Sequence, residues 1–177
     1  SYEQYEIVLI DNGSIDGSVL VVKQLLKRFR NVRLVVLSRE YEEQIAYTAA
    51  LENCIGDYIV VMDMHTDPPN AIPKMLSAAI AGADIVTATR SRLHVPLLYR
   101  VFSQLFYWIS NLLTDNRIEL SWTNYICFSR KMVNAILQIK DRVRYLKYFY
   151  SNIGYQHATI DVLSIDPNRY EKCGHVW

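Results

Sequence analysis

The fold class of this sequence is decided by the stretch Glu6-Ile7-Val8-Leu9-Ile10-Asp11-Asn12-Gly13-Ser14-Ile15-Asp16-Gly17-Ser18. Its first half is a near-continuous apolar run, which is typical of a strand covered on both faces. Its second half is a turn of residues that accept hydrogen bonds or tolerate positive φ. A helical pattern follows from Ser18 to Phe29. The order strand, turn, helix predicts a βα unit, whose polar loop is either an ordinary capped connection or a ligand-binding loop.

Two further apolar runs, Arg33–Leu37 and Tyr58–Met62, also end at polar residues. Arg39 follows the first of these runs closely, and Asp63 directly follows the second, as Asp11 follows the opening run. Open α/β sheets bind their ligands beyond the carboxyl ends of their strands. The three polar positions are therefore candidates for a functional site.

The remaining apolar patterns extend the alternation of helices and strands. Predicted helices cover Glu42–Cys54, about Asn70–Ala81, about 96–113 and Arg130–Ile139, and predicted strands cover Ala83–Thr89, Trp122–Ser129 and His157–Ile165. The length of 177 residues fits one domain. The pattern predicts a single α/β domain with a mostly parallel sheet sandwiched by helices.

Composition narrows the class of protein. The chain is 51% hydrophobic and carries 19 Lys+Arg against 18 Asp+Glu, which excludes a disordered chain and argues against a nucleic-acid partner. Its three cysteines, Cys54, Cys127 and Cys173, share no metal-ligand spacing, and their odd number argues against a closed disulfide framework. We therefore expect a reducing, cytoplasmic environment. The sequence shows neither a signal-peptide pattern nor an apolar run long enough to predict a spanning helix.

A candidate cation site follows the third apolar run. Asp63 and His65 lie two positions apart just beyond the strand, where alternate side chains can converge on one ion. A hard carboxylate with a borderline imidazole suits Mn²⁺ or a similar ion. The alternative for His65 is a loop imidazole that is hydrogen-bonded to backbone.

Taken together, these motifs resemble the family-2 glycosyltransferases of the GT-A fold, and among them the polyprenyl-phosphate (dolichol-phosphate type) sugar transferases. In that family one strand ends in Asp-Asp-Gly-Ser-x-Asp-Gly-Ser/Thr, a later one in Ser-Arg-Asn-x-Gly, and a third in Met-Asp-Ala-Asp-Leu-Gln-Asp-Pro-Pro. The segments Tyr5–Ser18, Leu37–Tyr41 and Val60–Pro69 occupy these places in order, and Ala88–Arg92 and Asp141–Lys147 extend the resemblance over the chain.

The resemblance implies a GT-A, Rossmann-like fold. It further implies that the family's first strand, which ends in Pro-x-Tyr-Asn-Glu, is absent from the chain, because Tyr2–Tyr5 already lead into the second. Residues 1–92 would form a nucleotide-sugar-binding half, and residues 93–177 an acceptor half.

The resemblance also implies roles for particular residues. It implies that the nucleotide contacts Asp11, Arg39, Asp63 and Met64. It implies that a Mn²⁺ or Mg²⁺ ion binds Asp63 and His65. The catalytic residues, which would contact phosphate and acceptor, would be Asn124, Arg142 and Arg144. Two departures stand out: His65 replaces the second Asp of an Asp-x-Asp motif in a loop one residue shorter, and Asn124 stands near the place of an Asp base. An amide does not titrate near neutral pH, but a lipid phosphate is already ionised and needs no base.

The expected function is transfer of a sugar from a nucleoside-diphosphate sugar to a polyprenyl phosphate, or to a lipid-linked or cell-surface glycan, with a divalent cation. The alternative is a non-catalytic glycosyltransferase-like module that binds nucleotide or a protein partner. The amphipathic pattern at 96–113 fits a helix on a membrane surface, a helix packed on the sheet or an oligomer contact. We therefore expect a location at the cytosolic face of a membrane, with a homo-oligomer as a further possibility.

Overall fold

The computed structural model describes residues 4–90, 122–139 and 154–162, which fall into two compact units. The first unit comprises residues 1–59 with 130–145, and the second comprises 60–129 with 146–177. The predicted helix at 96–113 and the predicted phosphate-handling residues Arg142 and Arg144 lie outside the described residues.

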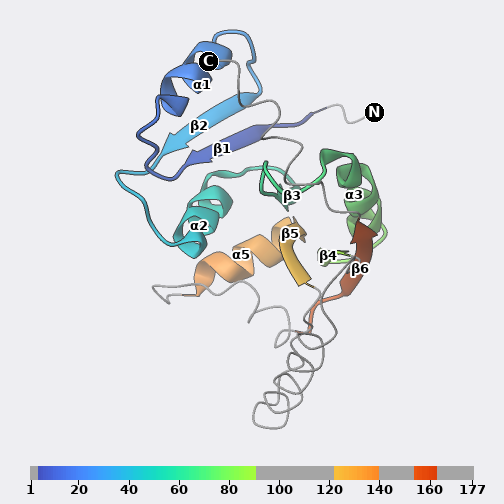
Figure 1. The fold of residues 1–177 in the computed structure, drawn as a ribbon. Coiled ribbons are helices and arrows are strands. Elements are labelled where there is room, and N and C mark those ends of the chain that lie inside the picture. The colour runs from blue at the N-terminus through green and yellow to red at the C-terminus, as the bar shows by residue number, and fades with distance from the viewer. Residues whose placement is uncertain (1–3, 91–121, 140–153, 163–177) are drawn as a thin grey trace, which may run out of the picture. The chain divides into compact units, whose positions relative to one another are not determined.

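The first unit contains a two-stranded parallel sheet (Figure 1). Its elements are β1 (Ile7–Asp11), α1 (Ser18–Leu26), β2 (Val32–Val36), α2 (Glu43–Asn53) and α5 (Arg130–Gln138). The register runs from Ile7 opposite Val32 to Asp11 opposite Val36, so both strands end at the same edge. Helix α1 contacts β2, and α2 contacts β1 and α5.

Arg130, at the start of α5, connects α5 to the end of α2. Its guanidinium donates to the carbonyls of Cys54 and Gly56, both at 2.9 Å, and its backbone N–H donates to the backbone carbonyl of Asp57 at 2.8 Å. The last carbonyls of a helix lack partners within the helix, and a cation there is favourable. Arg130 thus stabilises the turn that leads from α2 into the next strand.

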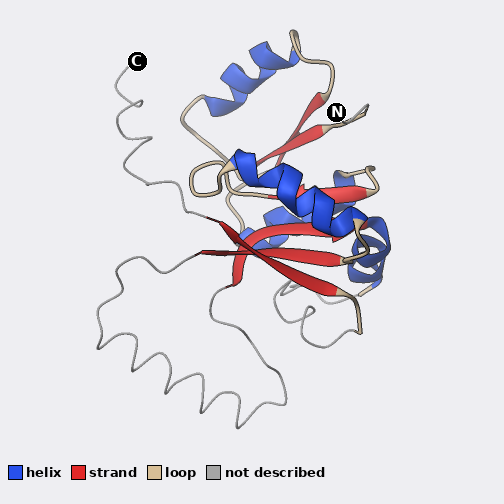
Figure 2. Cartoon of the chain, turned by 90° about the vertical axis from the view of Figure 1, so that its right-hand side faces the viewer, coloured by secondary structure: helices blue, strands red, loops and turns tan. Residues whose placement is uncertain are grey.

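The second sheet has four strands in the order β3-β5-β4-β6 (Figure 2). The elements are β3 (Tyr58–Val61), the 3₁₀ helix η1 (Pro69–Ala71), α3 (Ile72–Ile80), β4 (Ile85–Arg90), β5 (Trp122–Ser129) and β6 (His157–Val162). Strand β4 runs parallel to β6 and antiparallel to β5, so this sheet is mixed. The predicted α/β class is confirmed, and β5 is an antiparallel strand within the sheet that was predicted to be mostly parallel.

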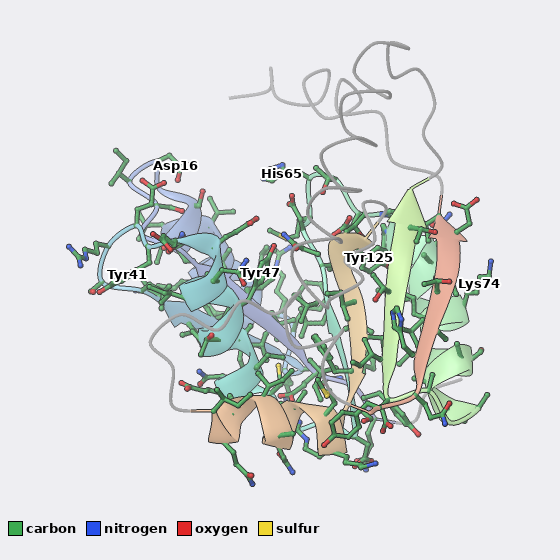
Figure 3. The ribbon with its side chains drawn as sticks, turned by 90° about the horizontal axis from the view of Figure 1, so that it is seen from below. Asp16, Tyr41, Tyr47, His65, Lys74 and Tyr125 are labelled. Carbon is green, nitrogen blue, oxygen red and sulfur yellow. The ribbon has the colours of Figure 1, made fainter. Side chains whose placement is uncertain are left out.

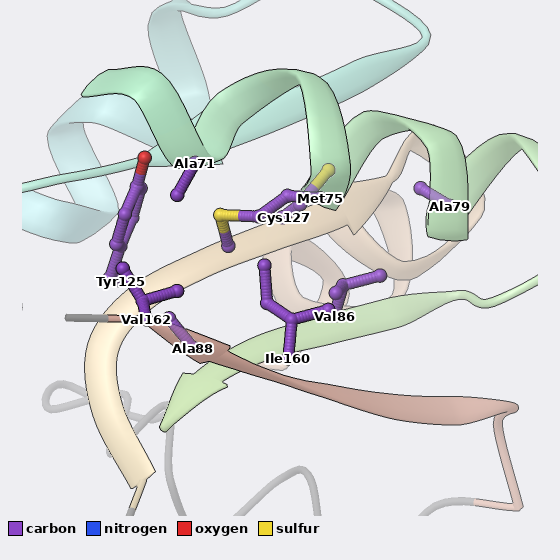
Figure 4. Close-up of a cluster of buried hydrophobic side chains, with 9 residues drawn as sticks. All are labelled: Ala71, Met75, Ala79, Val86, Ala88, Tyr125, Cys127, Ile160 and Val162. Atoms are coloured by element: carbon purple, nitrogen blue, oxygen red, sulfur yellow. The ribbon is translucent and has the colours of Figure 1, made fainter. Parts of the chain in front are cut away.

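A hydrophobic core lies between α3 and one face of this sheet (Figure 4). It consists of Ala71, Met75, Ala79, Val86, Ala88, Tyr125, Cys127, Ile160 and Val162. The helical members recur every four residues and the strand members every two, which are the periods that place side chains on one face.

The predicted elements that lie within the described residues recur in the structure with small shifts at their ends. The predicted strand Trp122–Ser129 is confirmed as β5, and the predicted helix at Asn70–Ala81 is divided into η1 and α3. Within the described ranges, no helix has both the length and the apolar character needed to cross a membrane. The absence of the family's first strand and the division into halves at residue 92 stay predictions.

Candidate functional site

The loops that follow β1 and β2 are joined by a side chain that the sequence analysis did not single out. Asn12 donates from Nδ2 to the backbone carbonyl of Tyr41 at 2.8 Å, and its Oδ1 accepts the Tyr41 N–H at 3.0 Å. The paired bonds use both ends of one amide, so they fix its orientation. Asn12 therefore holds the loop carrying Asp11 against the loop carrying Arg39.

Asp11 and Arg39 are positioned by local contacts in these two loops. Asp11 accepts the Ser14 N–H at Oδ2 (3.1 Å), and the Arg39 guanidinium lies 4.9 Å from the centre of the Tyr41 ring. Hydrogen bonds with Ser38 and Arg39 lower the pKa of Tyr41. The structure thus brings an acidic and a basic side chain to adjacent loops at one edge of the first sheet, as the sequence predicted.

The loop after β3 is organised around Asp63. Its Oδ1 accepts the His65 N–H at 2.8 Å, and its Oδ2 accepts the Thr66 hydroxyl at 3.0 Å. Both bonds fix the carboxylate, while the His65 side chain is exposed at the tip of the loop (Figure 3). Met64, a predicted nucleotide contact, is 64% exposed beside it. Asp63 and His65 therefore lie together on one short loop of the second unit.

Two buried residues, Asp67 and Tyr125, hold this loop in place through hydrogen bonds. The sequence did not predict this role for either of them. Asp67 is 2% exposed, and its Oδ2 accepts the Asp63 N–H at 2.8 Å. Tyr125 is 1% exposed and donates its hydroxyl to the Pro68 carbonyl at 2.9 Å (Figure 3). The Asp before Pro68-Pro69 was visible in the sequence, but its burial was not. Asn124, the predicted acceptor-side residue, is half-buried on β5.

The buried phenol of Tyr125 makes the free energy of unfolding depend on pH in the alkaline range. Burial, with a smaller contribution from the Asp67 charge, raises the pKa of Tyr125 from 10.0 to about 12. Between about pH 10 and about pH 12 the unfolded chain loses the Tyr125 proton while the folded protein keeps it. The stability present below about pH 10 is therefore lost as the pH rises to about 12. We expect the free energy of unfolding to fall over that interval and to fall less in Tyr125→Phe. Urea unfolding at several pH values checks this.

Cys127 limits how large that difference can be. Burial also raises the pKa of its thiol to about 12, so part of the alkaline loss of stability persists in Tyr125→Phe. Equal pH dependence of the wild-type protein and Tyr125→Phe would contradict the prediction. The double variant Tyr125→Phe/Cys127→Ala should show the flattest profile of the series.

Comparisons with known proteins identify the family and agree with the fold. The model of glycosyl transferase family 2 matches residues 1–145. An uncharacterized glycosyltransferase of Synechocystis is 28% identical over 158 residues, which are 88% of this chain and 50% of that protein. The undecaprenyl-phosphate 4-deoxy-4-formamido-L-arabinose transferase of Pseudomonas fluorescens is 28% identical over 90% of this chain and 47% of its own. The chain thus spans about half the length of these relatives.

A solved structure shows the same fold. The mannosyltransferase PcManGT of Pyrobaculum calidifontis, solved in complex with GDP-Man and Mn²⁺, has a TM-score of 0.60 and 15% identity over 92% of this chain and 47% of its own. This likeness confirms the GT-A fold. With a family model that matches most of the sequence, the chain belongs to glycosyl transferase family 2.

Proposed function

We propose that this chain carries the catalytic machinery of a transferase that moves a sugar from a nucleoside-diphosphate donor to a polyprenyl phosphate, with a divalent cation. The observation that carries the proposal is the loop after β3, where Asp63 accepts hydrogen bonds from His65 and Thr66 at its two oxygens. A carboxylate held in this way presents its remaining lone pairs in a fixed direction. Family membership makes sugar transfer the reaction to test.

The donor set of Asp63 and His65 fits a divalent cation shared with a diphosphate. A carboxylate oxygen with an imidazole nitrogen suits Mn²⁺, and Mg²⁺ is the harder alternative. In the part of the chain that the structure describes, no group of three or more His, Cys, Asp or Glu could hold a metal ion. Two protein ligands leave coordination positions for substrate phosphate and water, as is common for such ions. The bound cation would offset the charge that develops on the diphosphate leaving group.

The loops after β1 and β2 are proposed to bind the nucleoside. The Asp11 carboxylate can accept hydrogen bonds from a base or a ribose, and the Arg39 guanidinium can donate to either. Asn12 ties the two loops together, and the Tyr41 ring holds the guanidinium, so neither group must be ordered when the ligand binds. Met64 is proposed to contact the nucleotide next to the cation ligands.

The proposed acceptor is a lipid phosphate. The undecaprenyl-phosphate transferase among the relatives supports this class of acceptor. Asn124 offers an amide at the proposed acceptor side, which suits an acceptor that is ionised before it binds. Arg142 and Arg144, outside the described residues, are proposed to bind phosphate oxygens. A lipid-linked or cell-surface glycan is the second acceptor class, and its hydroxyl would require a base. The membrane surface and an oligomer stay proposals.

The test of the cation site is the His65→Ala variant. We expect it to weaken Mn²⁺-dependent binding of UDP or GDP at least about tenfold, which corresponds to about 1.4 kcal/mol, because one of the two protein ligands is lost. His65→Asp should retain binding and shift the preference from Mn²⁺ towards Mg²⁺, because a carboxylate is the harder ligand. Isothermal titration calorimetry with each nucleotide and each ion measures both effects.

Lys74→Ala is the control, because Lys74 is exposed on α3 (Figure 3) and the proposed site does not use it. Equal Mn²⁺-dependent affinity in the wild-type protein and His65→Ala would remove His65 from the cation site. Metal-dependent nucleotide binding without release of UDP or GDP from any sugar donor would favour the non-catalytic module. Absence of nucleotide binding would contradict the proposed function.

A further inference from the structure

The buried carboxylate of Asp67 calls for a physical explanation. Asp67 is 2% exposed, and an ionised carboxylate leaves water at a large cost unless hydrogen bonds replace its hydration. Its Oδ2 accepts the Asp63 N–H at 2.8 Å. In return, the Asp67 N–H donates to the Asp63 carbonyl at 3.0 Å. These two bonds join the first and last residues of a five-residue loop, and we name them the Asp63–Asp67 clasp.

The clasp is continuous with the hydrophobic core of the second unit. Pro68 follows Asp67, and its carbonyl accepts both the Tyr125 hydroxyl at 2.9 Å and the Ala71 N–H at 3.1 Å. Tyr125 is a core residue of β5, and Ala71 is the last residue of η1 before α3. The closing end of the loop is therefore anchored to the sheet and to the helix. Movement of this end is restricted by two rigid elements.

The other end of the loop carries the proposed cation ligands. The bond from Asp67 fixes the backbone N–H of Asp63, and the Asp63 carboxylate then accepts the His65 N–H and the Thr66 hydroxyl. A chain of hydrogen bonds thus runs from the buried carboxylate through Asp63 to the backbone of His65. A functional site must hold its groups within about 0.5 Å and 10–20° of the productive geometry, which requires a supporting set of contacts of this kind.

We infer that Asp67, assisted by Tyr125, is a positioning residue for the cation site, an inference that rests on the proposed function. Asp67 does not itself ligate the ion, because its carboxylate is buried beneath the loop and engaged with the Asp63 N–H. It sets the direction in which Asp63 and His65 face the ion. Partners of this type typically contribute about 10–100-fold to metal affinity.

The test is a set of variants read out by direct Mn²⁺ binding. Asp67→Ala is expected to raise the dissociation constant for Mn²⁺, measured by calorimetry with saturating UDP or GDP, by about 10–100-fold. Asp67→Asn keeps an acceptor oxygen for the Asp63 N–H and should recover most of the affinity. Tyr125→Phe, which keeps the ring and removes only the hydroxyl, should show a smaller loss in the same direction.

Thr87→Val is the matched control for a purely structural effect. Thr87 is a fully buried residue of β4 whose hydroxyl bonds His157, so its loss destabilises the same sheet without touching the loop. Unfolding in urea ranks the variants by stability, and the electron paramagnetic resonance line width of bound Mn²⁺ reports the symmetry of its ligands. We expect a broadened signal in Asp67→Ala and an unchanged signal in Thr87→Val.

The outcomes separate this inference from the proposed function. Wild-type Mn²⁺ affinity in Asp67→Ala, or an equal loss of affinity in Thr87→Val, would overturn the positioning role and leave the cation site in place. If Asp67→Ala does not fold, Asp67→Ser takes its place, because its side chain is one atom too short to reach the Asp63 N–H as the carboxylate does. Wild-type Mn²⁺ affinity in Asp67→Ser would overturn the positioning role of Asp67, and wild-type affinity in Tyr125→Phe would overturn the role of Tyr125. Failure of the wild-type protein to bind Mn²⁺ would overturn the proposed function together with this inference.

Discussion

Replacement of Asp63 by Asn is expected to remove the metal dependence of nucleotide binding and to lower sugar transfer by about 10²–10³-fold, the usual cost of losing one strong stabiliser of developing charge. The amide is a poorer ligand for a divalent cation because it has no charge and only one oxygen. The loop should keep its shape, since Asn still offers an oxygen to the His65 N–H, and the Thr66 hydroxyl can rotate to accept from the amide nitrogen.

Two measurements check this expectation. Calorimetry with UDP or GDP should give the same affinity with and without Mn²⁺ in Asp63→Asn, and release of nucleotide from a panel of UDP- and GDP-sugars should fall to near background. Asp57→Asn, the same chemical change at an exposed position in the turn before β3, is the control and should behave as the wild-type protein. Retained Mn²⁺ dependence in Asp63→Asn would show that the cation binds elsewhere.

The loop after β3 shows which part of the site local sequence could reveal. Asp63 and His65 were predictable because they follow a short apolar run directly, and the ends of such strands are where α/β sheets place polar chemistry. The hydrogen bond from Tyr125 that holds this loop in place was not predictable. Tyr125 lies in the apolar pattern of a strand, and its partner is a backbone carbonyl 57 residues earlier in the chain. A contact across that separation has no local signal, so it appears only once β5 is placed in the sheet.

The same distinction holds for the fold. Strand β5 was predicted with its observed bounds because hydrophobicity and β-branched or aromatic side chains are local properties. Its antiparallel direction beside β4 depends on pairings such as Ile85 with Phe128, which are remote in sequence. The helix predicted at Asn70–Ala81 begins instead with a 3₁₀ turn. Pro73 has no N–H to donate to the Pro69 carbonyl, as a continuous α-helix would require, and that carbonyl accepts the Ile72 N–H instead.

Gly13→Ala is expected to have the largest effect on stability among the loop variants. Gly13 has φ of 78°, and a Cβ at this position would lie 2.4 Å from the carbonyl carbon of Arg39 and 2.4 Å from the backbone nitrogen of Glu40. Both atoms are backbone, so no side-chain rotation relieves the contact. The left-handed conformation alone costs an Ala about 1–2 kcal/mol, and the displacement of the second loop adds to that cost.

Gly17→Ala is the matched control for backbone strain. Gly17 has φ of 86°, but nothing lies within 4 Å of the Cβ that it would gain. The two variants therefore share the conformational cost, and the difference in their free energies of unfolding isolates the close approach of the loops. Urea unfolding should place Gly13→Ala at least about 1 kcal/mol below Gly17→Ala, since a forced separation also strains the bonds between Asn12 and Tyr41.

The contact between these loops should matter for ligand binding as well as for stability. Asp11 precedes Asn12 in one loop and Arg39 lies in the other, so pushing the loops apart moves the two proposed nucleoside-binding groups away from each other. Gly13→Ala should then weaken binding of UDP or GDP even without Mn²⁺, whereas His65→Ala and Asp63→Asn weaken only the metal-dependent part. If Gly13→Ala and Gly17→Ala bind nucleotide equally well without metal, the contact between the loops does not contribute to nucleoside binding. A selective loss would instead place the nucleoside against the loops after β1 and β2.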